Sequence, residues 1–197
     1  RAEKGRRARA AADGVVQGLR SGGFEALLAG GCGRDLLLGR TPDDYDVATS
    51  ARAGEVQRLF ARTIPIGVHF GVVLVIEEGV PIEVATFRRD GAYLDHRHPA
   101  TVEFCGARED ALRRVFTING MFLDPATGEV IDYVGGREDL AAGILRAIGD
   151  PAARFDEDRL RLLRAIRFSA RFGYAIEPAT WEALRRLAPG ITAIAAE

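Results

Sequence analysis

The chain has 197 residues, of which 47% are apolar and 28% are charged, and its formal net charge is −1. This balance is typical of a folded domain with room for one sizeable core, and it gives no overall positive charge from which to argue nucleic-acid binding. The apolar runs are too short to span a bilayer, no signal peptide is evident, and the two cysteines have neither a disulfide framework nor a metal-type spacing. We therefore expect a cytoplasmic protein that does not use a membrane.

The hydrophobic pattern before residue 150 predicts alternating helices and short strands. The chain begins with an expected helix over 8–19, followed by a buried strand over 25–29 that runs into a glycine turn, a helix over 32–39, a strand over 44–50 and a helix over 53–61. Next we expect a β-hairpin over 70–87 that turns at Glu78-Gly79, and then a mobile polar loop over 88–100. The last elements before residue 150 are a strand over 101–104, a helix in two pieces over 108–122 and two short strands within 123–133.

The pattern changes near Gly149-Asp150-Pro151. Residues 156–172 read as one helix and a second helix is expected near Glu177. We therefore predict an α/β domain over 1–149 and the start of a helical domain over 150–197. We also expect this chain to be a piece of a longer one.

Three carboxylates are candidates for a metal site. Asp44 and Asp46 lie two residues apart, so in a strand they would project side by side. Two like charges that close favour a bound cation, and hard oxygen ligands suit Mg²⁺. Glu83, in a neighbouring β-rich run, could add a third carboxylate. The alternatives are a polar turn after Pro42 and an exposed strand residue at position 83.

The glycine turn ahead of these carboxylates is a candidate phosphate site. Gly30 and Gly31 let the backbone approach a phosphate, the following helix start favours anions, and Arg34 can add bidentate contacts. The turn is neither a P-loop nor a dinucleotide fingerprint. An ordinary strand-to-helix turn is the alternative.

The helix predicted over 156–172 would place Asp158 and Arg161 one turn apart. Such a pair can form a donor and acceptor edge that matches the Watson–Crick edge of cytosine or adenine. Arg164 and Arg167 follow at three-residue steps and could approach phosphates. The alternative is an amphipathic helix with a solvated charged face and with Leu160, Leu163 and Ile166 inward.

Five segments together resemble one enzyme family. They are GGCGRDLLLGR, DYDVATS, EVATFRRD, RRVFTIN and EDRLRLLRAIRF, in the family's order between residues 27 and 177. The chain resembles the class II nucleotidyltransferases that act on RNA 3′ ends, namely CCA-adding tRNA nucleotidyltransferases and bacterial poly(A) polymerases. The resemblance implies an α+β fold: a head with a small mixed β-sheet flanked by helices, followed by an all-helical neck.

The resemblance also implies roles for single residues. Asp44 and Asp46 would bind catalytic Mg²⁺, with Glu83 as the third catalytic carboxylate. Gly30, Gly31, Arg34, Arg114 and Asn119 would hold the triphosphate end of CTP or ATP, and Asp158, Arg161, Arg164 and Arg167 would line the base pocket. The loop 90–99 would help the pocket change between CTP and ATP.

One position departs from the family pattern, because Val115 stands where the motif RRDFTIN has an aspartate. The expected function is the addition of C and A to tRNA. Poly(A) addition, or the addition of only CC or only A, remains open, and so does a non-catalytic RNA- or nucleotide-binding module.

Overall fold

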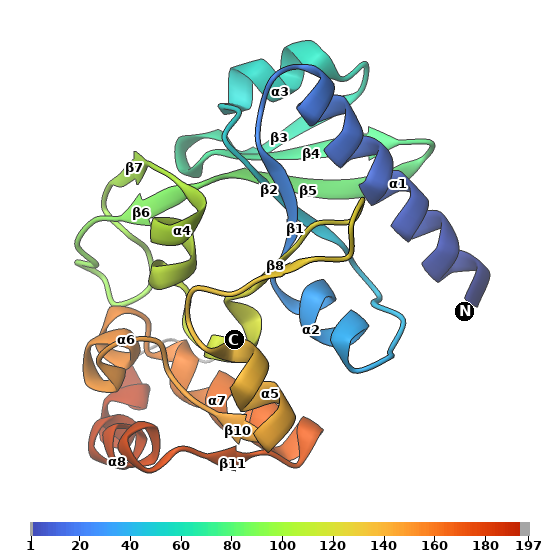
Figure 1. Cartoon of the computed structure of the whole chain (residues 1–197). Coiled ribbons are helices and arrows are strands. Elements are labelled where there is room, and N and C mark those ends of the chain that lie inside the picture. The colour runs from blue at the N-terminus through green and yellow to red at the C-terminus, as the bar shows by residue number, and fades with distance from the viewer. Residues whose placement is uncertain (1, 194–197) are drawn as a thin grey trace.

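A seven-stranded mixed sheet lies at the centre of the N-terminal part of the computed structural model, which describes residues 2–193 (Figure 1). Residue 1 and residues 194–197, at the outer ends of the two predicted domains, lie outside the described residues. The strand order is β3-β4-β5-β2-β1-β8-β9. The strands are β1 (Ala26–Ala29), β2 (Asp46–Thr49), β3 (Thr63–Gly67), β4 (Val72–Glu77), β5 (Val80–Thr86), β8 (Phe122–Leu123) and β9 (Val130–Ile131). The predicted mixed sheet flanked by helices is confirmed.

Helix α1 (Ala2–Ser21) covers one face of this sheet and contacts β1, β2, β4 and β5 (Figure 1). Its buried side chains recur at helical spacing through Ala8, Ala12, Val15 and Leu19. The helix is longer than the predicted 8–19 because its first two turns are polar and carry little of the apolar signal. Helices α2 (Gly31–Leu37) and α3 (Ala53–Leu59) confirm the other two predictions in this region.

The predicted hairpin is formed by β4 and β5, which pair antiparallel. Both turn residues, Glu78 and Gly79, have left-handed backbone angles, with φ of 48° and 80°. This is the conformation that two-residue hairpin turns favour. On its other side β5 pairs in parallel with β2, and this register places Asp46 opposite Glu83.

The segment 88–100 is more ordered than the mobile loop that the sequence predicts. Its first three residues form β6 (Arg88–Asp90), which pairs antiparallel with β7 (Val102–Phe104), and Tyr93 and Pro99 form a further bridge. The loop prediction is therefore wrong for 88–90. Buried polar contacts hold this charged strand in place: Asp90 pairs with Arg88 at 2.8 Å, and Asp110 accepts a hydrogen bond from the Arg88 backbone N–H at 3.0 Å.

The helical part from 150 onward begins with two helices where the sequence predicts one over 156–172. Helix α6 (Pro151–Glu157) ends at Asp158, and α7 (Leu160–Phe172) starts two residues later. The Asp158 carboxylate accepts a hydrogen bond from the Leu160 backbone N–H at 3.0 Å, which fixes the break. Helix α8 (Pro178–Leu187) starts after Glu177, as predicted.

The alternative interpretation of this helix, with Leu160, Leu163 and Ile166 inward, does not hold at two of these positions. Leu163 and Ile166 are 57% and 46% exposed, whereas Leu162 and Ala165 are buried. Helix α7 carries two apolar stripes, and the one through Leu162 faces the neighbouring elements.

A single apolar cluster joins the helical part to the preceding residues. Phe116, Ile118 and Leu145 pack with Phe155 and Leu162. The two-residue strand β11 (Ala175–Ile176) also pairs in parallel with β10 (Ile144–Leu145), so residues 150–193 are not wholly helical. The remaining helical segments are α4 (Ala107–Arg113), α5 (Gly136–Ala142) and the short 3₁₀ turns η1 (Val68–Phe70), η2 (Thr117–Asn119) and η3 (Ala188–Ala193).

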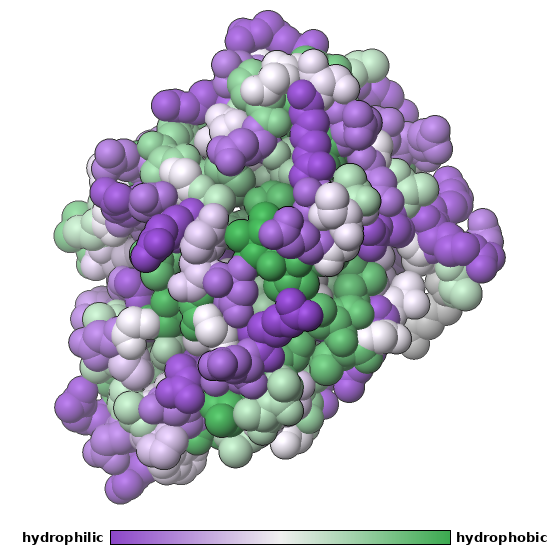
Figure 2. All heavy atoms as spheres, viewed as in Figure 1, coloured by the Kyte–Doolittle hydropathy of each residue, from purple (hydrophilic) through white to green (hydrophobic). Residues whose placement is uncertain are grey.

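The surface in Figure 2 is mainly hydrophilic, with a hydrophobic band across its middle over β1, β8 and α2. Within residues 2–193, no helix combines the length and apolar character needed to cross a membrane.

Candidate active site

A cleft of about 950 Å³ opens between the sheet, the β6–β7 hairpin and α7. It brings together residues that are more than 120 positions apart in the sequence, such as Gly30 and Arg161. All but one of the predicted site residues line it, namely Gly30, Gly31, Arg34, Asp46, Glu83, Arg114, Asn119, Asp158, Arg161, Arg164 and Arg167. Asp44 is exposed, precedes β2 and is not among the lining residues.

The carboxylates of Asp46 and Glu83 share one wall of this cleft because parallel pairing of β2 with β5 sets them side by side. The pKa of Asp46 is raised to about 6, first by the protein that displaces water around it and then by the charge of Glu83. Arg114 acts in the opposite direction, and Asp44 adds a smaller repulsion. Two carboxylates placed this close favour a cation between them.

This donor set suits a hard metal ion only when other ligands join it. Among residues 2–193, no group of three or more His, Cys, Asp or Glu side chains is placed to hold a metal ion. Mg²⁺ is commonly held by one or two carboxylates together with waters and substrate phosphates. Asp46 and Glu83, with Asp44 nearby, fit such a shared site.

The glycine turn lies directly beside these carboxylates. Gly30 has φ of 72°, and a Cβ built there would lie 3.6 Å from the Asp46 Oδ2 atom and 3.9 Å from the Arg114 Nη1 atom. A side chain at position 30 would thus strain the backbone and occupy the space between a carboxylate and an arginine. The turn keeps this space open for a ligand.

Arg34 is buried beside the turn and is held on several sides. Its Nη1 donates to the Asn119 Oδ1 atom at 2.6 Å, and its Nη2 pairs with Asp35 at 2.8 Å. Its guanidinium lies 4.7 Å from the ring centre of Phe172, at the end of α7. Asn119 and Phe172 therefore fix the direction in which Arg34 presents its remaining donors.

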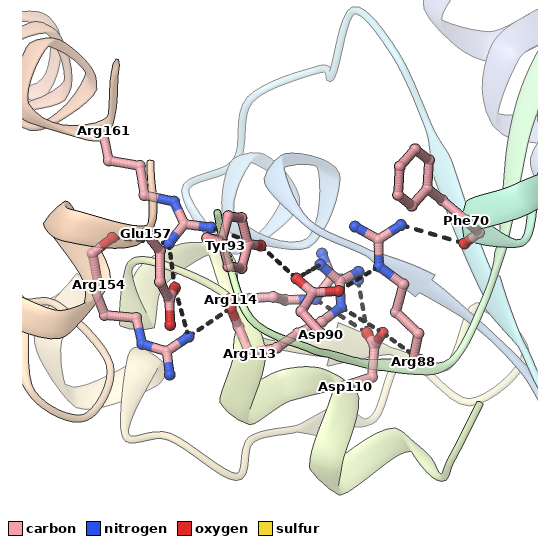
Figure 3. A network of polar contacts seen from close by, with 10 residues as sticks. All are labelled: Phe70, Arg88, Asp90, Tyr93, Asp110, Arg113, Arg114, Arg154, Glu157 and Arg161. Carbon is pink, nitrogen blue, oxygen red and sulfur yellow. Dashed lines mark hydrogen bonds and ion pairs between the residues drawn. The ribbon is translucent and has the colours of Figure 1, made fainter. Parts of the chain in front are cut away.

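Asp110, which the sequence analysis missed, organises arginines that line the cleft (Figure 3). This buried carboxylate accepts from the Arg113 Nε at 3.1 Å and from the Arg114 Nη2 at 2.9 Å, besides the Arg88 backbone. Burial by itself would raise the pKa of Asp110, but Arg114 and Arg113 reverse that effect and hold the pKa below its ordinary value. The i, i+3 and i+4 spacing of Asp110, Arg113 and Arg114 is the signal that could have found it.

Arg161 and Asp158 both line the cleft, but Asp158 lies at the break between α6 and α7 rather than on one continuous helix with Arg161. The Arg161 Nη1 pairs with the Glu157 carboxylate at 2.6 Å and donates to the Arg154 carbonyl at 2.9 Å. Its Nη2 donates to the Tyr93 hydroxyl at 3.4 Å (Figure 3). Asp158 keeps a carboxylate at the helix break, where it bonds the Leu160 backbone.

Two more arginines on α7, Arg164 and Arg167, are exposed and line the same cleft. Arg171, which the sequence analysis did not select, follows on the same face and also lines it. The side of the cleft formed by α7 therefore carries a row of positive charge suited to phosphates.

Val115 lines the cleft too and packs against the apolar cluster that joins the two parts of the chain. Its backbone carbonyl accepts from the Ile148 N–H at 2.7 Å. The position that carries an aspartate in the family motif therefore contributes packing and a backbone contact here.

Comparisons with known proteins agree with this geometry. Residues 26–146 match the family described as the poly A polymerase head domain. A CCA-adding enzyme of Leuconostoc mesenteroides is 44% identical over 184 residues, which are 93% of this chain and 46% of that protein. The CCA-adding enzyme of Anoxybacillus flavithermus gives the same identity and the same coverage of both chains.

Solved structures give the same result. A crystal structure of the Bacillus stearothermophilus CCA-adding enzyme in complex with CTP has a TM-score of 0.86 at 40% identity, and the match covers 94% of this chain and 45% of that one. A Thermotoga maritima CCA-adding enzyme complexed with tRNA has a TM-score of 0.72 at 28% identity, over 90% of this chain and 41% of that one. The chain spans about half the length of the relatives it matches.

Proposed function

Because the chain belongs to the poly(A) polymerase head-domain family of nucleotidyltransferases, we propose that it adds C and A from CTP and ATP to the 3′ end of tRNA, without a nucleic-acid template and with release of pyrophosphate. The observation that carries this proposal is one cleft that joins a carboxylate pair, a glycine turn with two arginines, and Arg161. These groups match the three things that such an enzyme must hold, which are the metal ion, the triphosphate of the nucleotide and its base.

In the proposed reaction the RNA 3′-hydroxyl attacks the α-phosphorus in line and pyrophosphate leaves. Asp44, Asp46 and Glu83 would hold Mg²⁺, which when bound supplies activation of the hydroxyl and neutralisation of the phosphate charge. Gly30 leaves room for the phosphates beside Asp46, and Gly31 leaves room beside the Arg34 guanidinium. Arg34, fixed by Asn119, would orient the triphosphate, so that much of the rate comes from positioning.

Arg114 would act between the metal and the triphosphate. Asp110 holds the Arg114 guanidinium, and the positive charge of Arg114 lowers the pKa of Asp46. On the opposite side of the cleft, Asp158 and Arg161 would select the base by hydrogen bonds, and Arg164 and Arg167 would contact the nucleotide or the RNA backbone.

We also propose that residues 1–149 act as the catalytic head and residues 150–197 as the start of a nucleotide-selecting neck. The apolar cluster around Phe116 and Phe155 would keep the two in register. The two free cysteines, Cys32 and Cys105, are in keeping with a reducing, cytoplasmic setting.

Primer extension tests the proposal. The protein is given Mg²⁺ and each labelled NTP with tRNAs that end before CCA, after C and after CC, beside an unstructured RNA. We expect additions that stop after CCA on tRNA. Long A-tails on either RNA would assign poly(A) addition instead, which the family's name makes the second candidate. Addition limited to CC or to A would assign a partial enzyme.

A matched pair of variants links the result to the cleft. Asp46→Ala should abolish incorporation, whereas Glu138→Ala, an exposed carboxylate on α5, should leave it unchanged. Nucleotide binding without incorporation by the unaltered protein would favour the non-catalytic binding module.

A further inference from the structure

The segment 91–99 forms direct contacts with the junction between α6 and α7. The His96 Nδ1–H donates to the Asp156 carbonyl at 2.6 Å, and the Arg159 backbone N–H donates to the His96 carbonyl at 3.2 Å. Asp158 lies between these two attachment points. The segment is therefore docked on the helical part beside Asp158, the first of the two proposed base-selecting residues.

Tyr93, at the start of this segment, lies between Arg161 and Asp90 (Figure 3). The Arg161 guanidinium carbon is 5.4 Å from the centre of the Tyr93 ring, and the Arg161 Nη2 donates to the Tyr93 hydroxyl at 3.4 Å. One side chain thus contacts Arg161 both through its ring and through its oxygen.

Tyr93 is itself held from behind. Its hydroxyl donates to the Asp90 Oδ2 atom at 2.6 Å, and Asp90 pairs with Arg88 at 2.8 Å. Burial raises the pKa of Tyr93 to about 12, and the hydrogen bond with Asp90 adds to the shift, so the hydroxyl stays protonated and remains a donor. A ring anchored in this way has little freedom to rotate away from Arg161.

The other contacts of Arg161 act on one nitrogen only. Glu157 and the Arg154 carbonyl both bind the Nη1 atom. These two partners use the donors of Nη1 and hold that end of the fork. Tyr93 restrains the Nη2 end and one face. Selection by hydrogen bonds to a base edge requires a fixed plane, because the direction of the donors carries the selectivity.

We propose that Tyr93 is a positioning residue that holds the Nη2 end and one face of Arg161, and so determines how strictly C and A are selected over U and G. This inference rests on the proposed function, because it takes Arg161 as a base-selecting group. It predicts a role for the hydroxyl as well as for the ring. Tyr93 acts through Arg161, and the structure gives it no direct role in the chemistry.

Two substitutions separate the hydroxyl from the ring. Tyr93→Phe keeps the ring under the guanidinium and removes the link to Asp90, whereas Tyr93→Ala removes both. Tyr133→Ala is the matched control, since Tyr133 is a 42% exposed tyrosine that also has an arginine, Arg108, 6.0 Å from its ring centre but does not line the cleft. Thermal unfolding of each variant shows whether it is folded, and Tyr93→Phe keeps the test valid if Tyr93→Ala does not fold.

The measurement is kcat/KM for each of the four NTPs in single-nucleotide primer extension. We expect the preference for CTP over UTP to fall about fivefold in Tyr93→Phe and about thirtyfold in Tyr93→Ala, from the loss of a charged hydrogen bond and of a cation–π contact. Tyr133→Ala should keep the preference of the unaltered protein. The loss should lie mainly in KM for CTP, because the phosphates and carboxylates are not displaced.

A double variant decides whether the effect passes through Arg161. Tyr93→Ala with Arg161→Ala should select no worse than Arg161→Ala alone, because Tyr93 then has nothing left to orient. Additive losses, or a Tyr93→Ala variant as selective as the unaltered protein, would overturn the inference while the proposed function stands. Absence of nucleotide transfer by the unaltered protein would instead overturn the proposed function.

Discussion

Replacing Asp110 by asparagine tests whether the arginines along this wall of the cleft depend on one buried carboxylate. Asp110 is 1% exposed, and it accepts hydrogen bonds from the Arg88 backbone and from the side chains of Arg113 and Arg114. Asparagine has nearly the same shape but no charge. The change therefore leaves two arginine side chains, each 19% exposed, close together without their shared counter-charge.

The expected cost follows from the burial of this group. Removing one partner of a buried ion pair lowers the free energy of unfolding by about 3–5 kcal/mol. Asparagine keeps one acceptor oxygen, so we expect about 2–4 kcal/mol. For a chain of this size that corresponds to a fall in Tm of about 4–16 °C.

Urea and thermal unfolding, followed by circular dichroism, measure this loss. Asp13→Asn is the control, because Asp13 pairs with Arg9 at 2.8 Å on the surface of α1 and its side chain is 44% exposed. Such an exposed pair contributes no more than about 0.5 kcal/mol. If Asp110→Asn cost no more than Asp13→Asn, the argument that Asp110 organises this region would be refuted.

The pH dependence gives a second check on Asp110. Its pKa is lower in the folded chain than in the unfolded chain, so its contribution is fully present above the ordinary carboxyl range and is lost as the pH falls through the folded value. The difference in stability between the unaltered protein and Asp110→Asn should be constant from about pH 5 to 8 and should shrink below about pH 4. A difference that grows on acidification would contradict the assigned direction.

Three further predictions concern the cleft and the thiols. Asp46→Asn should lower the single-turnover rate with CTP by about 10³-fold, because it removes charge that faces the reacting phosphate; a loss below tenfold would contradict the role of Asp46. Arg34→Lys should weaken CTP binding about tenfold in calorimetry, since lysine cannot both reach Asn119 and stack on Phe172; unchanged affinity would remove Arg34 from the triphosphate site. Burial raises the pKa of Cys32 to about 11, so a thiol reagent at pH 8 should modify Cys105 well before Cys32, and equal rates would contradict the burial of Cys32.

Much of the fold could be predicted because its signals are local. The β4–β5 hairpin follows from two β-branched runs around Glu78-Gly79, and α1 follows from the spacing of Ala8, Val15 and Leu19. The short helix after the glycine turn is also present, as α2. In each case one face of one element carries its own hydrophobic pattern.

The errors arose where contacts between distant segments decide the structure. The strand at Arg88–Asp90 is polar, and Asp110, about 20 residues further on, holds it. The break before Leu160 is a local exception, because the Asp158 side chain bonds the Leu160 backbone and no glycine or proline marks the position. The choice between the two apolar stripes of α7 depends on the apolar cluster around Phe155, which the sequence of the helix alone does not contain.

The candidate site was predicted from motifs more completely than its geometry was. Arg34 and ten other predicted site residues, which came from the resemblance or from short sequence patterns, do line one cleft. The argument that placed Asp44 and Asp46 on one face of a strand does not describe Asp44, because β2 begins at Asp46. Tyr93 and Asp110 were missed because their importance lies in the partners that they hold, and a single sequence does not display those partners.

The parallel pairing of β2 with β5 makes tolerance of insertions and deletions very uneven along this chain. Residues of β5 alternate between a buried face with Ile82 and Val84 and the cleft face with Glu83. A residue added at the Glu78-Gly79 turn would lengthen only the turn. One added between Val80 and Glu83 would turn the carboxylate toward the apolar core under α1 and take it away from Asp46. Length variants of this protein should therefore accumulate at the hairpin turn and be excluded from the few residues that follow it.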